Sequence, residues 1–167
     1  DNAIHVAKNI KLQDLDNPEL RLESCGNLAS KLAESRRIRE ELIFFQRNFP
    51  QKKYGAVLDG RDIGSVIFPN AKIKLFVIAD LEVRAQRRQE EYKKMGQVYS
   101  LRDLTEKLKE RDKRDKNRKV SPLICMTDAI VFDNSQISFE RLNKEIIEIV
   151  EKKYKSLNLN TNIKKKS

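Results

Sequence analysis

Three short apolar segments of the chain each end at an aspartate, and amphipathic segments separate them. Residues 56–58 stop at Asp59, residues 73–79 at Asp80, and residues 129–132 at Asp133. Runs of branched and aromatic residues bounded by turn residues are typical of buried strands. Strands that alternate with helices predict an α/β fold with a parallel sheet flanked by helices. Such sheets bind ligands beyond the carboxyl ends of their strands, where we expect the three aspartates.

The segments around the strands have the apolar spacing of helices. From about Leu20, this spacing predicts two consecutive helices, or one bent helix, ending before Pro50, with Leu28 and Ala29 on the buried face. Three further helices are predicted over residues 81–95, 101–117 and 138–154. Ser100 with Asp103 three residues later forms a capping-box pattern at the start of the second of these. A length of 167 residues suits a single domain.

The net charge of +10 points to an anionic partner: nucleic acid, a membrane surface or a small phosphorylated ligand. Aromatic residues make up 7% of the chain and lie in apolar runs, which argues against base-stacking platforms and nucleic-acid binding. No apolar run approaches the roughly 20 residues of a membrane span, so we expect no membrane partner and a cytoplasmic location. Two distant cysteines, Cys25 and Cys125, are expected to be free thiols, and no metal-binding cluster is predicted.

The first segment with chemical potential is Asp59-Gly60-Arg61-Asp62-Ile63-Gly64. A glycine after a strand lets the backbone turn tightly and approach a ligand. Asp59 at a strand end is placed to hold a magnesium-bound water, as the second acidic motif of phosphate-loop enzymes does. A polar turn with an Asp–Arg ion pair explains the same residues equally well.

Two arginine-rich helices form the other candidate groups. Arg111, Arg114, Asp115 and Arg118 lie on one helical stripe, and their excess positive charge suggests a missing anionic partner. The earlier helix carries Arg84, Arg87 and Arg88 and is joined to the next by a segment containing Gly96. Such a pair of helices is able to form a hinged lid over a triphosphate. Solvated helix faces remain the alternative for both groups.

Taken in order, these motifs resemble bacterial cytidylate kinase. The resemblance rests on Asp59-Gly60-Arg61-Asp62-Ile63-Gly64, Glu110-Arg111-Asp112, Arg114-Asp115, Asn117-Arg118 and Pro122-Leu123, and it extends from about Leu20 to Tyr154. It implies a nucleoside monophosphate kinase fold and transfer of the γ-phosphoryl group of ATP to CMP or dCMP with Mg²⁺. The implied organisation is an acceptor-binding helical region at 1–50, a core with a lid around 84–118 at 51–155, and a basic, disordered tail at 156–167. A monomer is expected.

The resemblance also implies roles for individual residues. Ser30, Arg39 and Asp62 match positions that read cytosine, and their hydroxyl, guanidinium and carboxylate groups suit that base. Arg61 and Arg118 match clamps on the α-phosphate, and Arg111 and Asp115 match ribose contacts. Arg87 and Arg88 resemble lid residues that face the donor nucleotide. Asp59, Arg61 and Arg118 are the implied catalytic residues.

One part of the family pattern is not found in the sequence. Family members begin with a strand and a Gly-rich loop that cradles the donor phosphates, whereas no Gly-x-x-x-x-Gly-Lys motif occurs in these 167 residues. We therefore expect the chain to belong to a longer enzyme, or to have lost that segment, and to be inactive alone. The alternatives are a non-catalytic CMP-binding remnant and a basic nucleic-acid-binding domain.

Overall fold

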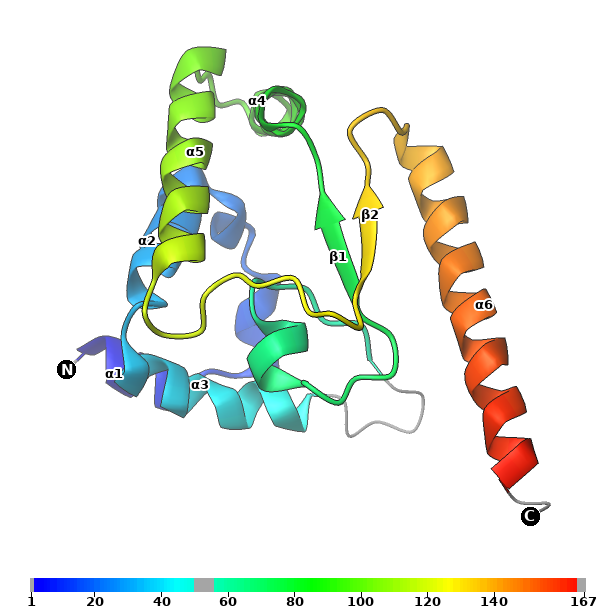
Figure 1. Cartoon of the computed structure of the whole chain (residues 1–167). Coiled ribbons are helices and arrows are strands. Elements are labelled where there is room, and N and C mark those ends of the chain that lie inside the picture. Colours follow the sequence, from blue (N-terminus) through cyan, green and yellow to red (C-terminus); the bar gives the residue numbers. More distant parts are fainter. Residues whose placement is uncertain (1, 50–55, 165–167) are drawn as a thin grey trace.

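The computed structural model describes residues 2–49 and 56–164, so the predicted boundary between residues 50 and 51 lies outside the described residues. The element order is α1 (Asn2–Asn9), the short 3-10 helices η1 (Leu12–Asp16) and η2 (Pro18–Arg21), α2 (Glu23–Leu32), α3 (Arg36–Asn48), the π-helical turn η3 (Ile63–Ile67), β1 (Leu75–Ile78), α4 (Leu81–Lys94), α5 (Leu101–Asn117), β2 (Ile130–Asp133) and α6 (Phe139–Lys164). In Figure 1, α1, α2, α3 and α5 lie to one side of the two strands and α6 lies to the other.

The two strands form a small parallel sheet, with Leu75 paired to Ile130 and Ile78 paired to Asp133. This confirms the coarse prediction of a helix-rich α/β fold with a parallel sheet. The first predicted strand, at residues 56–58, is wrong: these residues form no strand, and Val57 is 97% exposed. A strand needs a neighbour for its backbone hydrogen bonds, and β1 pairs only with β2 in the part of the chain that the structure describes.

Two separate helices occupy the region predicted as a helix pair, and Ser35 caps the second by accepting a hydrogen bond from the Ile38 amide. The predicted buried face of the first helix, Leu28, Ala29, Leu32 and Ala33, is wrong at its first two residues: Leu28 is 56% exposed and Ala29 is also exposed, whereas Leu32 and Ala33 are half-buried. The buried residue of α2 is instead Ser30. The face of α2 that is covered is therefore the one on which the Ser30 hydroxyl donates to Asp115 of α5.

A buried apolar group lies between α4 and α5, where Ala85, Tyr92 and Leu104 are buried and Tyr99 packs against them. Both helices have the predicted bounds within one or two residues. Ser100 accepts a hydrogen bond from the Asp103 amide at 3.0 Å, as the capping pattern predicts. Gly96, at φ 74°, makes the turn between the two helices, a backbone conformation that glycine adopts without strain.

The last helix, α6, continues to Lys164, ten residues past its predicted end at Tyr154. Its backbone is therefore helical over residues 156–164, part of the segment predicted as a disordered tail, and residues 165–167 lie outside the described range. No glycine or proline interrupts the sequence after Phe139, so nothing stops the helical hydrogen bonding there. Within the described ranges, no helix combines the length and apolar character that crossing a membrane requires. Cys25 and Cys125 are free thiols, as predicted.

Candidate functional site

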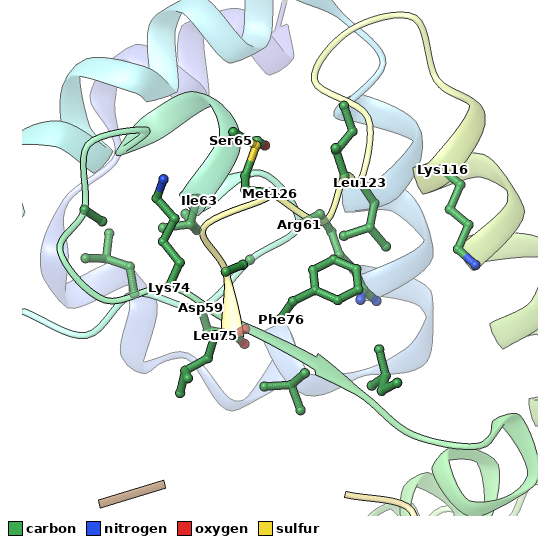
Figure 2. A pocket seen from close by; sticks show the side chains of 18 of the residues that line it. Asp59, Arg61, Ile63, Ser65, Lys74, Leu75, Phe76, Lys116, Leu123 and Met126 are labelled. Carbon is green, nitrogen blue, oxygen red and sulfur yellow. The ribbon is translucent and has the colours of Figure 1, made fainter. Parts of the chain in front are cut away.

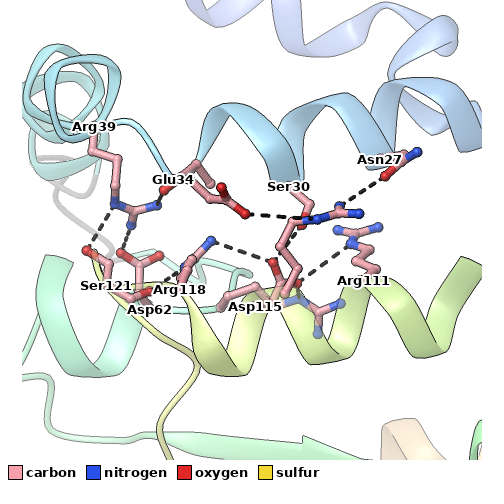
Figure 3. A network of polar contacts seen from close by, with 12 residues as sticks. Asn27, Ser30, Glu34, Arg39, Asp62, Arg111, Asp115, Arg118 and Ser121 are labelled. Atoms are coloured by element: carbon pink, nitrogen blue, oxygen red, sulfur yellow. Dashed lines mark hydrogen bonds and ion pairs between the residues drawn. The ribbon is translucent and has the colours of Figure 1, made fainter.

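A buried carboxylate, Asp115 on α5, is the centre of a network of polar side chains (Figure 3). Its Oδ1 accepts a hydrogen bond from the Ser30 hydroxyl at 2.8 Å. Three guanidinium groups surround it: Arg61 Nε lies 3.2 Å from Oδ2, Arg111 Nε 3.7 Å from Oδ2, and Arg118 Nη1 3.6 Å from Oδ1. Because Arg111, Asp115 and Arg118 follow helical spacing and Arg61 comes from the loop before η3, the network joins helix and loop.

A second carboxylate, Asp62, lies beside this group and forms an ion pair with Arg39 of α3. Arg39 Nε also donates to the Ser121 hydroxyl at 3.0 Å, and Arg118 Nε donates to the Ser121 carbonyl at 2.7 Å. Asp62 is 6% exposed and Arg118 is 7% exposed, so both charges are largely removed from water. Ser121 thus connects the Asp62 pair to the Asp115 group.

Positive charge exceeds negative charge in this network, since four arginines, Arg39, Arg61, Arg111 and Arg118, form their ion pairs with two carboxylates, Asp62 and Asp115. Burial, and then the neighbouring guanidinium of Arg39, lowers the pKa of Arg118. Burial, and then Arg61, lowers the pKa of Arg111. Both residues stay protonated at neutral pH, because arginine titrates far above it. The imbalance of two positive charges matches one dianion.

Arg118 Nη2 is a buried donor that makes no hydrogen bond among the described residues. Arg111 Nε and Asp115 Oδ2 also make none, but they face each other at 3.7 Å. A buried donor without a partner costs about 1–3 kcal/mol, and more when it is charged. An anion bound at this place would remove that cost.

The Arg111 side chain packs against α2 at Gly26, where no side chain occupies the space. A Cβ atom at Gly26 would lie 3.0 Å from Arg111 Nη1, tighter than an ordinary contact. The neighbouring Arg114 is held on the same side, with Nη1 donating to Asn27 Oδ1 at 3.0 Å. The predicted helical stripe therefore faces α2 rather than solvent, which rejects the solvated-face alternative for this group.

A cavity of about 430 Å³ lies next to the network, bordered by β1, the loop at residues 58–65 and the C-terminal half of α5 (Figure 2). Apolar side chains such as Phe76 and Leu123 line part of it. Charged side chains line the rest: Asp59, Arg61, Lys74, Arg84, Asp112 and Lys116. Arg84 Nη2 pairs with Asp112 Oδ2 at 2.7 Å and so ties α4 to α5 across this wall.

The structure brings together seven predicted residues in one network: Ser30, Arg39, Arg61, Asp62, Arg111, Asp115 and Arg118. Arg61 and Asp62 form Asp–Arg ion pairs, as the polar-turn alternative predicts, but each pair reaches outside the turn: Arg61 pairs with Asp115 and Asp62 with Arg39. Arg61 lines the large cavity, whereas Arg111 lines a separate cavity of about 30 Å³ between α2, α4 and α5. The carboxylates between them divide the surface.

The remaining predicted residues lie outside the network. Asp59 is exposed and lines the large cavity, but it follows no strand. Arg87 donates to the Asn134 side chain at 2.9 Å and so lies at the loop after β2. Arg88 pairs with Glu91 at 3.0 Å and lies 5.7 Å from the Tyr92 ring centroid. Asp80 and Asp133 lie at the carboxyl ends of the strands, as predicted. The Ser135 hydroxyl joins them by accepting from the Asp80 amide and donating to the Asp133 carboxylate.

Two residues of the site were not predicted from the sequence. Ser121 accepts hydrogen bonds from two arginines, Arg39 and Arg118. No sequence pattern indicates that a serine before a proline has this role. Lys74 is buried and donates to the Pro69 carbonyl at 2.5 Å and to Asp128 at 2.7 Å, which lowers the pKa of the Asp128 carboxyl. It lies in the apolar run of the second predicted strand, where a single lysine gives no sign of burial. No group of three metal-ligating side chains occurs in residues 2–49 and 56–164.

Known proteins are similar to this sequence over most of its length. The family model "Cytidylate kinase" matches residues 3–152. A cytidylate kinase of Methylococcus capsulatus is 44% identical over 129 residues, which cover 77% of this chain and 58% of that protein. One of Afipia carboxidovorans is 42% identical over 149 residues, covering 89% of this chain and 71% of that protein, and one of Marinomonas is 45% identical over 123 residues, covering 74% and 54%. With the family model spanning almost all of it, the chain belongs to the cytidylate kinase family.

Proposed function

We propose that this chain supplies the acceptor-nucleotide site of an enzyme that transfers the γ-phosphoryl group of ATP to CMP or dCMP, giving CDP or dCDP. Membership of the cytidylate kinase family supports the reaction class. The observation that carries the proposal is the excess of two guanidinium charges around the buried carboxylates Asp115 and Asp62, with the buried Arg118 Nη2 lacking an acceptor. A nucleoside monophosphate presents a dianionic phosphate that fits this excess.

At the phosphate end, Arg61 and Arg118 are the proposed clamps. Both already pair with Asp115, so their guanidinium planes are held before a ligand arrives. Arg118 keeps one buried Nη2 group for a phosphate oxygen. Arg111 and Asp115 are then the proposed ribose contacts, since they lie on the same stripe of α5.

At the base end, Ser30, Arg39 and Asp62 are the proposed cytosine-reading residues. A carboxylate accepts from the exocyclic amine, and a guanidinium and a hydroxyl donate to the carbonyl and ring nitrogen. In the free chain Asp62 and Arg39 satisfy one another. Base recognition therefore exchanges an internal ion pair for hydrogen bonds to the ligand, and a base with the wrong donor pattern leaves a charge unpaired.

Donor-side residues are fewer. Asp59 is the proposed carboxylate for a magnesium-bound water, and Mg²⁺ would supply charge neutralisation on the transferring phosphoryl group. A single exposed carboxylate suits a cation that is held mainly by substrate phosphates. Arg87 and Arg88 are the proposed donor-facing residues. None of the five glycines stands in a Gly-x-x-x-x-Gly-Lys motif, so the residues present do not form a complete cradle for ATP phosphates.

The acceptor site is tested by calorimetry on the 167-residue chain with CMP and with cytidine, which lacks the phosphate. We expect CMP to bind at least about tenfold more tightly, because only CMP fills the anion position. Arg118→Gln should weaken CMP binding by about 10- to 100-fold. Arg141→Gln removes an exposed arginine that pairs with Glu145 on α6, and it is the matched control with unchanged binding. Equal affinity for CMP and cytidine contradicts the proposal.

The reaction is tested by a coupled assay with ATP and Mg²⁺. We expect the 167-residue chain alone to form no CDP, because phosphoryl transfer depends on positioning and neutralising the γ-phosphate. Robust turnover by the purified chain would contradict the need for a Gly-rich loop. In an enzyme that includes this chain together with such a loop, equal turnover of AMP and CMP would contradict the choice of CMP.

A further inference from the structure

Ser121 has an unusual backbone conformation in the middle of the polar network. Its φ is 49°, and it is the only non-glycine residue with positive φ in residues 2–49 and 56–164. The left-handed region is costly for residues other than glycine, asparagine and aspartate. The following Pro122 restricts Ser121 further. Backbone strain of this kind persists where the surrounding contacts enforce it, and it clusters at functional sites.

Both acceptor groups of Ser121 are used, each by a different arginine. Its hydroxyl accepts from Arg39 Nε at 3.0 Å, and its carbonyl accepts from Arg118 Nε at 2.7 Å (Figure 3). The loop that carries it is fixed at one end by Arg118, whose amide donates to the Arg114 carbonyl at 2.9 Å. The Leu123 amide fixes the other end by donating to the Asp115 carbonyl at 2.8 Å. The strained residue therefore lies on a loop closed over the last turn of α5.

The hydrogen bond from each arginine Nε to Ser121 fixes the orientation of that guanidinium group. It therefore decides which partners the two Nη atoms can reach. With Nε on the Ser121 carbonyl, Arg118 directs Nη1 to Asp115 and leaves Nη2 without an acceptor. With Nε on the Ser121 hydroxyl, Arg39 directs Nη2 to Asp62 and Nη1 to the Ala33 carbonyl. One serine thus orients an arginine at the base end and another at the phosphate end of the proposed acceptor site.

We propose that Ser121 is a positioning residue for acceptor binding: its hydroxyl aligns Arg39 for the base, and its carbonyl aligns Arg118 for the phosphate. This inference rests on the proposed function. The two roles are separable, because a substitution removes the hydroxyl and keeps the carbonyl. A side-chain variant should therefore weaken recognition of the base and spare recognition of the phosphate.

The test compares CMP with ribose 5-phosphate, which has no base, by calorimetry on the 167-residue chain. We expect Ser121→Ala to weaken CMP binding by about tenfold, the effect of a hydrogen bond to a charged group, and to leave ribose 5-phosphate binding within about twofold. Ser121→Asn tolerates positive φ and restores an acceptor oxygen, so it should recover most of the CMP affinity. Ser121→Gly removes the hydroxyl without backbone strain and should repeat the alanine result even where the alanine variant folds poorly.

The outcomes separate this inference from the proposed function. Unchanged CMP affinity in both the alanine and glycine variants overturns the role of Ser121 while the unchanged chain still binds CMP. Equal losses for CMP and ribose 5-phosphate, or no recovery with asparagine, overturn the separate roles of hydroxyl and carbonyl. If the unchanged chain binds neither compound, the proposed function fails, and the positioning role fails with it.

Discussion

The two halves of helix α5 are packed in opposite ways. The N-terminal half buries Leu104 against Ala85 and Tyr92 of α4. The C-terminal half buries Asp115 among guanidinium groups opposite α2. Burial of apolar side chains stabilises the fold without any bound ligand. Buried charged groups stabilise it only when groups of opposite charge neutralise them. One helix therefore has an end that supports the fold and an end whose charge balance is open to a ligand.

The largest effect is expected from Asp115→Asn, which breaks the charged half. The change leaves Arg61, Arg111 and Arg118 without the carboxylate between them, and uncompensated buried charge costs about 3–5 kcal/mol of unfolding free energy. Urea unfolding measures the loss. Added phosphate should stabilise this variant more than the unchanged chain, because the anion replaces the missing charge. Stability equal to that of the unchanged chain would show that water hydrates the three guanidinium groups well enough to make the carboxylate unnecessary.

The apolar half is tested by Leu104→Ala, for which we expect a loss of about 3 kcal/mol, within the usual cost of a cavity. Urea unfolding is again the measurement. Phosphate should add no more stability here than in the unchanged chain, since no charge is removed. A phosphate effect as large as in the Asp115 variant would mean that the two halves of α5 are not independent.

A smaller effect is expected from Asp62→Ala, which sharpens the assignment at the base end. Loss of an acceptor for the exocyclic amine of cytosine should cost about 1–3 kcal/mol of CMP binding and hardly change UMP binding. Parallel titrations with the two nucleotides measure the difference. Equal losses for CMP and UMP would assign Asp62 to holding Arg39 instead of reading the base.

Helices α2 to α5, the start of α6, two of the three strands and seven members of the network were predictable because each depends on local spacing or on motif order. Arg111, Asp115 and Arg118 share a face by helical geometry alone. The strand predicted at residues 56–58 does not form. A short apolar run becomes a strand only beside a partner strand, and tertiary structure decides where partner strands lie. The left-handed Ser121 and the buried Lys74 likewise depend on contacts distant in sequence.

The glycine beside Arg111 has a consequence for engineering this chain. Glycine inside a helix costs about 1 kcal/mol relative to alanine, so helix propensity alone favours Gly26→Ala in α2. The added methyl group would lie 3.0 Å from Arg111 Nη1 and push that guanidinium by a few tenths of an ångström. A screen that selects only for heat resistance and accepts this exchange would displace Arg111 within the polar network. Helix propensity and the position of Arg111 are therefore opposed at Gly26, and libraries that vary it need selections both for stability and for the proposed nucleotide binding.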